Sequence, residues 1–358
     1  MPEGEIKPYL SSPSGVNMKR VSLKDVAKKA GVAPSTVSLV LNGKAKQRRI
    51  SDTLAAKIES LAKAAGYQPH PVAVNLRTGQ SRILGLIVES ISGSFFAALA
   101  RTIEEEAERH GYKVLYCSTE NNPQKGKELI QMMLKQQVDG YLITPAPGME
   151  TEIGQLMQNR QPLVLMDSYF KDVSTPYVLV DNYKGMRSCV DHLLEKGYRN
   201  IGLVTADLDL VQLQQREQAY RDACKQYNIT AAKQHVLKLK YDMPQDAIIR
   251  RIGSFIKSKR QPDALVFATN YLGVAGLEAI DRLGLRIPEH LAVVCFDDHD
   301  VFRLYPPGIS AFEQPIANIA KTAIALLMEQ LKNGSADKTK KQSQQILLEG
   351  KLIMRRST

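Results

Sequence analysis

Residues Val21–Gly43 read VSLKDVAKKAGVAPSTVSLVLNG, and this stretch predicts two short helices joined by a tight turn. Ser22 can cap the first helix, and Gly31 can end it. Pro34 suits the first position of the second helix. The apolar positions recur at helical spacing, and they are Leu23, Val26, Ala27 and Ala30 in the first helix and Val37, Val40 and Leu41 in the second. The stretch therefore predicts a helix-turn-helix.

Positive charge gathers around this motif. The chain carries a net charge of +11, and residues 19–79 hold twelve lysines and arginines against three acidic residues, so this sixth of the sequence contributes +9. A third helix is predicted from Ser51 to about Gly66, with the basic loop Lys44–Arg49 before it. Such a concentration of charge next to a helix-turn-helix favours contact with the phosphates of nucleic acid.

Composition excludes several classes of protein. The 358 residues are 44% hydrophobic and 24% charged, as in folded globular proteins. No apolar run approaches the roughly 20 residues that span a bilayer, and no signal-peptide pattern opens the sequence, so we expect a cytoplasmic protein. The four cysteines stand far apart, which predicts reduced thiols with no disulfide framework, metal site or cofactor.

From Arg82 onward, short apolar runs alternate with longer amphipathic segments. The predicted strands are Ile83–Val88, Lys113–Tyr116, Gly140–Ile143, Leu163–Met166, Tyr177–Val180, Ile201–Val204, Ala264–Ala268 and Leu291–Cys295. The predicted helices are Phe95–His110, Gln124–Gln136, Tyr183–Glu195, Gln214–Gln226, Asp246–Lys257, Tyr271–Leu283 and Ile316–Lys332. Continuous apolar strands that alternate with helices predict an α/β fold of two doubly wound parallel-sheet lobes, with a ligand crevice at the carboxyl ends of the strands.

The first stretch, followed by RISDTLAAKIESLAKAAGYQPHPVAVNLRTG at Arg49–Gly79, resembles the headpiece and hinge of the lactose-repressor (LacI/GalR) family of bacterial transcription regulators. Later motifs such as VDGYLI, LGLRIPEHLAVVCFDD and FEQP extend the resemblance over nearly the whole chain. It implies two lobes like those of periplasmic sugar-binding proteins. The expected domains are a disordered extension (1–19), a three-helix headpiece (20–68), a hinge helix and linker (69–81), and a region for effector binding and dimerisation (82–358). Within that region we expect a first lobe of about 82–180 plus 312–340 and a second of about 181–311 plus 341–358.

The resemblance implies DNA contacts along the headpiece and hinge. They fall on Ser22, Pro34, Ser35, Thr36, Ser38, Leu39, Asn42, Ser51, Tyr67, Ala73 and Leu76. In the family, paired hinge helices enter the minor groove and a leucine separates base steps, a role that falls on Leu76. Ordinary helix capping and solvent exposure are the alternative for Ser35, Thr36 and Ser38.

The resemblance also implies an effector site. Its expected residues are Phe96, Asp167, Arg216, Asn270, Asp297 and Gln314. Carboxylates, amides and a guanidinium suit a polyhydroxylated ligand such as a sugar. Structural alternatives remain open, because Arg216 could form an ion pair between the lobes and Phe96 could belong to the core.

Five positions depart from the family pattern. Leu39 stands where many members have arginine, and Ala33 and Pro34 replace a more usual polar pair, so we expect an atypical operator. Ser168 replaces a frequent arginine and Tyr271 a frequent aspartate, so the identity of the effector stays open.

The sequence thus predicts a homodimeric regulator, a repressor in the first instance, that binds a near-palindromic operator in double-stranded DNA. Operator affinity would depend on a small molecule, a sugar or sugar derivative, bound between the lobes. The alternatives are a periplasmic-type sugar-binding protein and a DNA-architectural protein without an effector. An enzyme is not expected, because the sequence has no phosphate-binding loop, nucleophile elbow or pair of metal-spaced histidines.

Overall fold

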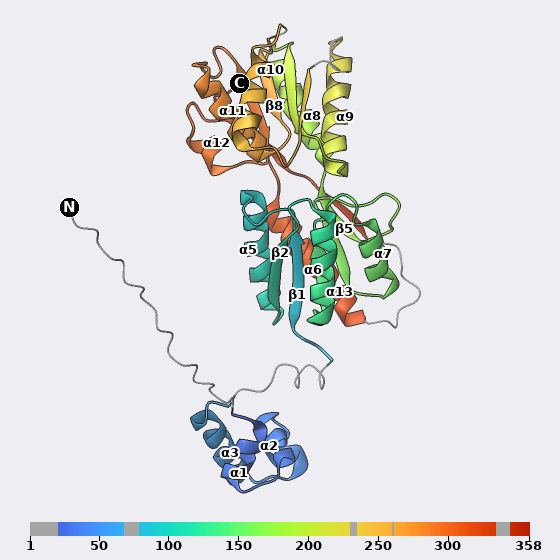
Figure 1. Cartoon of the computed structure of the whole chain (residues 1–358), viewed down its shortest axis with the longest axis vertical. Coiled ribbons are helices and arrows are strands. Elements are labelled where there is room, and N and C mark those ends of the chain that lie inside the picture. The colour runs from blue at the N-terminus through green and yellow to red at the C-terminus, as the bar shows by residue number, and fades with distance from the viewer. Residues whose placement is uncertain (1–20, 68–78, 230–234, 260, 334–343) are drawn as a thin grey trace, which may run out of the picture. The chain divides into compact units, whose positions relative to one another are not determined.

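The computed structural model describes residues 21–67, 79–229, 235–259, 261–333 and 344–358. It divides into two compact units, Met1–Ser81 and Arg82–Thr358 (Figure 1). No helix among the described residues is long and apolar enough to cross a membrane. Cys189, Cys224 and Cys295 are buried free thiols and Cys117 is partly buried.

Residues 21–67 of the small unit form three α-helices and a short 3-10 helix. They are α1 (Leu23–Ala30), α2 (Pro34–Leu41), the 3-10 helix Lys46–Arg48 and α3 (Asp52–Ala64). A capping box starts α1, since the Ser22 hydroxyl accepts from the Asp25 N–H at 3.3 Å and the Asp25 carboxylate accepts from the Ser22 N–H at 2.8 Å. Gly31 ends α1 with a φ of 72°, a conformation that glycine adopts without a steric cost. The predicted helix-turn-helix is confirmed.

Buried side chains from all three α-helices form the core of this unit. They are Val26, Ala27, Ala30, Val37, Val40, Ile58 and Ala62. Half-buried Leu54, Leu61 and Tyr67 pack against this cluster. With so few buried side chains, the unit leaves most of its charged residues on the surface.

The large unit contains two six-stranded sheets, one for each lobe. The first has the order β11-β5-β4-β3-β1-β2 and the second β12-β10-β9-β8-β6-β7. All neighbouring strands are parallel except β10 and β12, which are antiparallel. The strands are β1 (Ile83–Val88), β2 (Lys113–Ser118), β3 (Gly140–Ile143), β4 (Leu163–Met166), β5 (Tyr177–Val180), β6 (Ile201–Ala206), β7 (Val236–Leu239), β8 (Ala264–Phe267), β9 (Ala292–Phe296), β10 (Ser310–Glu313), β11 (Gln345–Leu348) and β12 (Lys351–Ile353).

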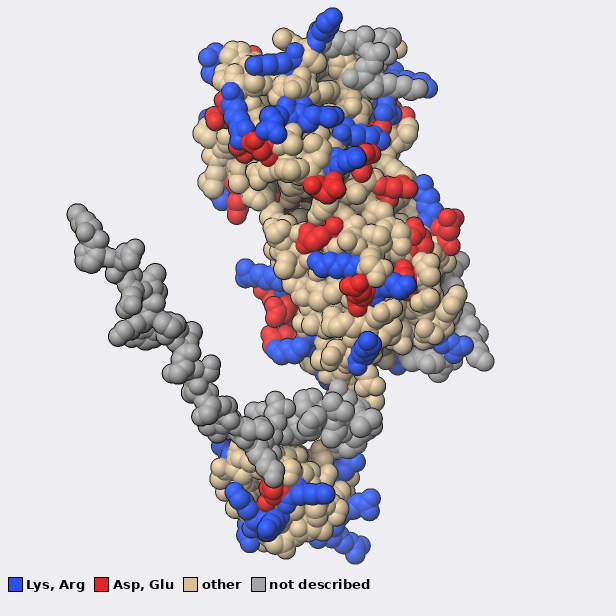
Figure 2. All heavy atoms as spheres, viewed as in Figure 1, with Lys and Arg blue, Asp and Glu red and all other residues tan. Residues whose placement is uncertain are grey.

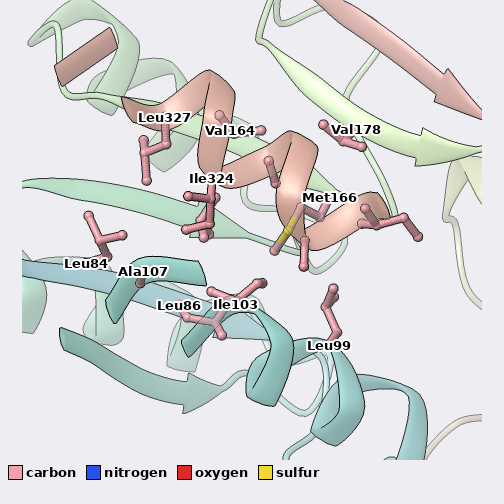
Figure 3. Close-up of a cluster of buried hydrophobic side chains, with 14 of the residues drawn as sticks. Leu84, Leu86, Leu99, Ile103, Ala107, Val164, Met166, Val178, Ile324 and Leu327 are labelled. Carbon is pink, nitrogen blue, oxygen red and sulfur yellow. The ribbon is translucent and has the colours of Figure 1, made fainter. Parts of the chain in front are cut away.

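Helices cover both faces of each sheet. They are α5 (Ser94–Arg109), α6 (Pro123–Lys135), α7 (Glu150–Gln158), α8 (Asn182–Glu195), α9 (Val211–Gln226), α10 (Gln245–Ile256), α11 (Asn270–Arg282), α12 (Asp300–Leu304) and α13 (Ile316–Asn333). In the first lobe, alternate strand residues pack against α5 and α13 on one face and against α6 and α7 on the other. Figure 3 shows the first of these clusters, with Leu99 and Ile103 of α5 and Ile324 and Leu327 of α13. Because both faces are buried, the central strands read as continuous apolar runs.

The second lobe repeats this arrangement. Its sheet packs against α10, α11 and α12 on one face and against α8 and α9 on the other. The predicted strands and helices are all present, with ends that differ by a few residues at most. The predicted α/β fold with two doubly wound lobes is therefore confirmed.

The predicted limits of the lobes need two corrections. Residues 345–348 form β11, which pairs with β5 and therefore belongs to the first lobe, whereas 341–358 was assigned entirely to the second. Phe312 and Glu313 lie in β10, which pairs with β9 in the second lobe, whereas the first lobe was expected to resume at residue 312. The chain thus passes between the lobes three times, after β5, after β10 and between β11 and β12.

Candidate DNA-binding surface and ligand pocket

The start of α2 and the loop after it form the candidate DNA-binding surface. Ser35 is exposed, Thr36, Ser38 and Leu39 are half-buried, and Val37 and Val40 point into the core. Exposed basic side chains lie on α1 and on the loop after α2, and they are Lys24, Lys28, Lys29, Lys44, Lys46, Arg48 and Arg49. In Figure 2 blue atoms clearly outnumber red ones on the visible face of this unit. Such a surface suits the DNA backbone.

Several residues predicted to contact DNA also have a structural role within the headpiece. Ser22 and Ser51 are the N-caps of α1 and α3, where their hydroxyls accept from backbone N–H groups. The Asn42 side-chain amide donates to the Ser38 carbonyl oxygen at 2.6 Å. These observations fit helix capping and leave room for phosphate contacts, since a hydroxyl can both donate and accept. Pro34 occupies the first turn of α2 and is exposed, and Ala73 and Leu76 lie outside the described residues.

Five of the six residues predicted to bind the effector line one pocket of about 380 Å³ within the large unit. These five are Phe96, Asp167, Arg216, Asn270 and Asp297. The pocket also includes Glu89, Ser90, Ser92, Gly93, Phe95, Glu120, Ala206, Leu210, Gln212, Leu213, Tyr241, Ile248, Thr269 and Tyr271. Its polar residues come mainly from loops that follow β1, β2, β4, β8 and β9. The carboxyl ends of parallel strands are where α/β folds bind ligands.

Asp167 and Asp297 each come directly after a buried strand, β4 and β9, and both have a left-handed backbone, with φ of 62° and 69°. This conformation is costly for residues other than glycine, although short polar side chains tolerate it better than most. Strained residues of this kind gather at ligand sites, where the surrounding structure holds them in place. The strand ends thus fix two carboxylates, one from each lobe, at the same pocket.

Arg216 contributes a guanidinium group to the lining of this pocket, and the residue is only 2% exposed. Its Nε donates to Asn182 Oδ1 at 2.9 Å, and its Nη1 donates to the Ala268 carbonyl at 2.6 Å and lies 3.6 Å from Asp297 Oδ2. The guanidinium carbon lies 3.6 Å from the centre of the Phe296 ring. Arg216 and Asp297 both belong to the second lobe. Their ion pair is therefore not the ion pair between the lobes that was the alternative role for Arg216.

Gln314 lies outside the lining of this pocket. Its Nε2 donates to Asp297 Oδ1 at 2.5 Å, and it lines a second cavity of about 690 Å³ together with Asp297 and His299. Gln314 therefore positions a pocket carboxylate in this structure. Phe96 combines two roles, because it is 8% exposed within the core of the first lobe and also lines the pocket.

Three hydrogen bonds join the two lobes at the pocket. Gln212 Nε2 donates to Asp167 Oδ2 at 2.9 Å, Asn270 Nδ2 to Ser94 Oγ at 3.1 Å, and the Tyr241 hydroxyl to Glu120 Oε2 at 3.3 Å. In two of them a carboxylate of the first lobe accepts from a neutral side chain of the second. The lobes are thus connected by polar groups that a ligand could also engage.

Buried carboxylates give the pocket unusual acid–base properties. Burial, together with the neighbouring Asp167, raises the pKa of Glu89 to about 7. Burial also raises the pKa of Asp167 to about 6, with Arg216 acting in the opposite direction, and it raises the pKa of Asp297. Perturbed carboxylates in a pocket are a frequent mark of a functional site.

The sequence reasoning missed Glu89, Glu120, Gln212 and Tyr241. Glu89 follows the apolar strand Ile83–Val88 directly, and this position at the end of a predicted strand is a signal that could have found it. Tyr241 follows β7, which was not predicted. The sequence therefore contains no indication that Tyr241 lies at the end of a strand. Tyr271, noted as a departure, lines the pocket, and Ser168 does not.

Comparison with known proteins finds one family model within each of the two units. Residues 22–70 match the family model of bacterial regulatory proteins of the lacI family, and residues 190–358 match that of the periplasmic binding protein-like domain. The HTH-type transcriptional repressor PurR of Haemophilus influenzae (strain PittEE) is 27% identical over 94% of this chain and 98% of the relative. The ribose operon repressor of H. influenzae (strain Rd) is 27% identical over 87% of this chain and 92% of the relative.

Solved structures agree at the level of the fold. The lac repressor dimer bound to operator and the anti-inducer ONPF superposes with a TM-score of 0.80 at 21% identity, covering 95% of this chain and 99% of the other. The complex of the regulator CelR with cellobiose gives a TM-score of 0.68 at 23% identity, covering 95% and 100%. A basic helix-turn-helix unit followed by a two-lobed pocket defines the class of DNA-binding regulators that respond to ligands. The chain carries a DNA-binding domain of the lacI family at residues 22–70 and a periplasmic binding protein-like domain at residues 190–358.

Proposed function

We propose that this chain is a transcriptional repressor that acts as a homodimer, with each headpiece on one half of a near-palindromic operator. A small molecule in the 380 Å³ pocket controls its affinity for the operator. The observation that carries the proposal is the convergence of strand-end carboxylates from both lobes on one pocket, in a chain that also has a lacI-family DNA-binding domain. A ligand that contacts both lobes changes how they close, and this change can reach the DNA-binding unit.

The proposed effector is a sugar or a sugar derivative. Asp297, Arg216 and Asn270 offer the paired acceptors and donors that polyhydroxylated molecules need, and Phe96 offers an apolar face. Relatives support this class, since CelR has been solved with cellobiose and another lacI-type regulator, from Alkaliphilus metalliredigens, with D-xylulofuranose. The repressor role places the chain in the bacterial cytoplasm, in contact with the nucleoid, and requires no catalysis.

The DNA contacts remain part of this proposal. Ser35, Thr36, Ser38 and Leu39 would meet base edges in the major groove, and the basic side chains of α1 and the loop after α2 would meet phosphates. Ala73 and Leu76 would act in the minor groove if the hinge folds on DNA.

In vitro selection from a random duplex library with the full chain tests the function. The expected result is an enriched sequence with approximate two-fold symmetry, bound at least 1,000-fold more tightly than random DNA in the same salt. Enrichment without any sequence preference would instead favour an architectural protein. No DNA binding at all would favour a binding protein of the periplasmic type.

A further inference from the structure

We propose that the natural ligand of the 380 Å³ pocket is a cation, a small ring compound that carries a protonated amine. This inference rests on the proposed function, because it names the class of effector for the same pocket. A neutral sugar is the competing ligand, and the charge and the aromatic residues of the pocket decide between the two.

Negative charge dominates the lining of the pocket. Four carboxylates, those of Glu89, Glu120, Asp167 and Asp297, face a single guanidinium, that of Arg216. Arg216 lies next to Asp297, donates to Asn182 and to the Ala268 carbonyl, and lies over the Phe296 ring. Within the described part of the chain, the carboxylates of Glu89, Glu120 and Asp167 have no lysine, arginine or histidine within 4 Å. Glu89 and Asp167 are partly buried and Glu120 is exposed, and a ligand that covered them without a counter-charge would bury carboxylates at a cost, whereas a cationic ligand would supply the missing charge.

Aromatic rings form a second part of the lining. Phe95, Phe96, Tyr241 and Tyr271 all contribute to it. The rings of Tyr241 and Tyr271 meet edge to face with centroids 6.1 Å apart, and those of Phe95 and Phe96 do so at 5.1 Å. Aromatic faces attract ammonium groups, and the attraction grows when water is excluded. Aromatic rings combined with carboxylates are the chemistry by which proteins recognise amines.

An unpaired acceptor gives independent evidence of a ligand donor. Gln212 lines the pocket, is only 5% exposed, and uses its Nε2 to bond Asp167. Its Oε1 has no hydrogen-bond partner among the described residues. A buried amide oxygen can only accept, and leaving it unpaired costs about 1–3 kcal/mol in typical proteins, so it favours a ligand that brings an N–H or O–H donor to this point.

Both lobes contribute to this lining. Glu89, Glu120 and Asp167 follow strands β1, β2 and β4 of the first lobe, which also supplies Phe95 and Phe96. The second lobe supplies Asp297, Tyr241 and Tyr271. An ammonium group between the lobes would attract the three carboxylates of the first lobe and the two tyrosine rings of the second. The charge of the ligand would therefore favour closure of the cleft.

Calorimetric titration of the full chain with matched amine and alcohol pairs tests the proposal. The probes are D-glucosamine with D-glucose, D-galactosamine with D-galactose, and phenethylamine with phenethyl alcohol, all at pH 7.5. We expect at least one amine to bind ten-fold or more tightly than its alcohol. Glu89→Gln should reduce that preference at least five-fold, and Glu120→Gln, an exposed residue at the pocket, gives a second variant that should reduce it in the same direction.

Glu289→Gln is the matched control, because it removes an exposed carboxylate outside the pocket and should leave the preference unchanged. Alcohols that bind as tightly as their amines, an absence of binding by all three amines, or a preference that survives both Glu89→Gln and Glu120→Gln would overturn the proposal. Binding of the selected operator is measured on the same samples. Intact operator binding without an amine preference rejects only the cationic ligand, whereas loss of specific DNA binding by the wild-type chain rejects the proposed function.

Discussion

Arg216 is the residue on which the geometry of the pocket depends most. It contacts Asn182, the Ala268 carbonyl and Asp297 from a position that is almost fully buried. Asp297 in turn is held by Gln314. A single substitution of Arg216 would therefore leave a buried carboxylate without its counter-charge and a carbonyl without its donor.

We expect Arg216→Ala to lower the free energy of unfolding of the large unit by about 3–5 kcal/mol. The comparison is Arg221→Ala on the same helix, which removes a partly exposed pair with Glu217 and should cost less than about 1 kcal/mol. Urea unfolding followed by circular dichroism measures both. A similar loss of unfolding free energy in the two variants would show that the buried ion pair of Arg216 stabilises the unit no more than the partly exposed pair of Arg221.

Glu89 makes stability depend on pH. Its pKa in the folded chain, about 7, lies above its ordinary value of 4.5, so the folded form holds the proton more tightly than the unfolded form. The groups that face it are Asp167, Glu120 and Tyr241. Stability from this group is therefore complete below pH 4.5 and is lost as the pH rises through 7.

Glu89→Gln removes this titration. At pH 8 the variant should be more stable than the ligand-free wild type, on the order of 1–2 kcal/mol, and the difference should shrink toward pH 5. Thermal unfolding of both proteins from pH 5 to pH 8 measures it. A difference in stability between the two proteins that stays constant from pH 5 to pH 8 would contradict the raised pKa of Glu89.

Leu39 stands where many family members have arginine, and this difference should alter which operator sequence the chain binds. It is half-buried near the middle of α2, where it can offer a thymine methyl only an apolar contact. Leu39→Arg should shift the selected operator toward guanine at one position in each half-site, with discrimination of about 1–3 kcal/mol. Parallel selections with wild type, Leu39→Arg and Leu39→Ala would show this, and identical enriched sequences would remove Leu39 from the contact surface.

At the scale of elements, two helix glycines offer a matched pair. A Cβ on Gly276 of α11 would lie 2.1 Å from the buried Phe267 ring, whereas a Cβ on Gly253 of α10 would meet nothing within 4 Å. Gly276→Ala should therefore destabilise the large unit by about 1–3 kcal/mol through overpacking. Gly253→Ala should stabilise it by about 0.5–1 kcal/mol, because alanine loses less entropy in a helix. Equal urea midpoints of unfolding for the two variants would mean that α11 can shift away from the Phe267 ring with no loss of stability.

The elements that sequence reasoning found are those whose pattern reflects burial. Central strands such as β1 and β8 are apolar throughout, because helices cover both faces of the sheet. The strands it missed lie mostly at sheet edges, and β7, β11 and β12 mix exposed with half-buried positions. Their place depends on pairing with distant segments, as β11 pairs with β5, and a local pattern does not encode that.

Local sequence patterns also limit which residues of the pocket can be predicted. Asp167 and Asp297 were both expected from the resemblance to the family, and both follow strands that the apolar pattern predicts. Gln314 follows β10, which was not recognised, and its contact with Asp297 instead of the pocket depends on tertiary geometry. The excess of carboxylates over bases appeared only when both lobes were assembled around one cavity.

In the whole molecule, ligand binding at the pocket and operator binding by the headpiece are two linked events. If a ligand changes operator affinity, operator DNA must change ligand affinity by the same factor. The lobes supply the means, since polar groups of both meet at one pocket and the chain passes between the lobes three times. The direction of the coupling decides whether the ligand acts as inducer or corepressor.

The most direct test of ligand-controlled DNA binding is the affinity of the full chain for its selected operator, measured by fluorescence anisotropy without ligand and at saturating concentration of the tightest probe from the calorimetric titration. The account predicts a change of at least five-fold, matched by the same factor in the affinity for that probe when operator is present. An operator affinity that stays the same at saturation of the pocket would contradict it.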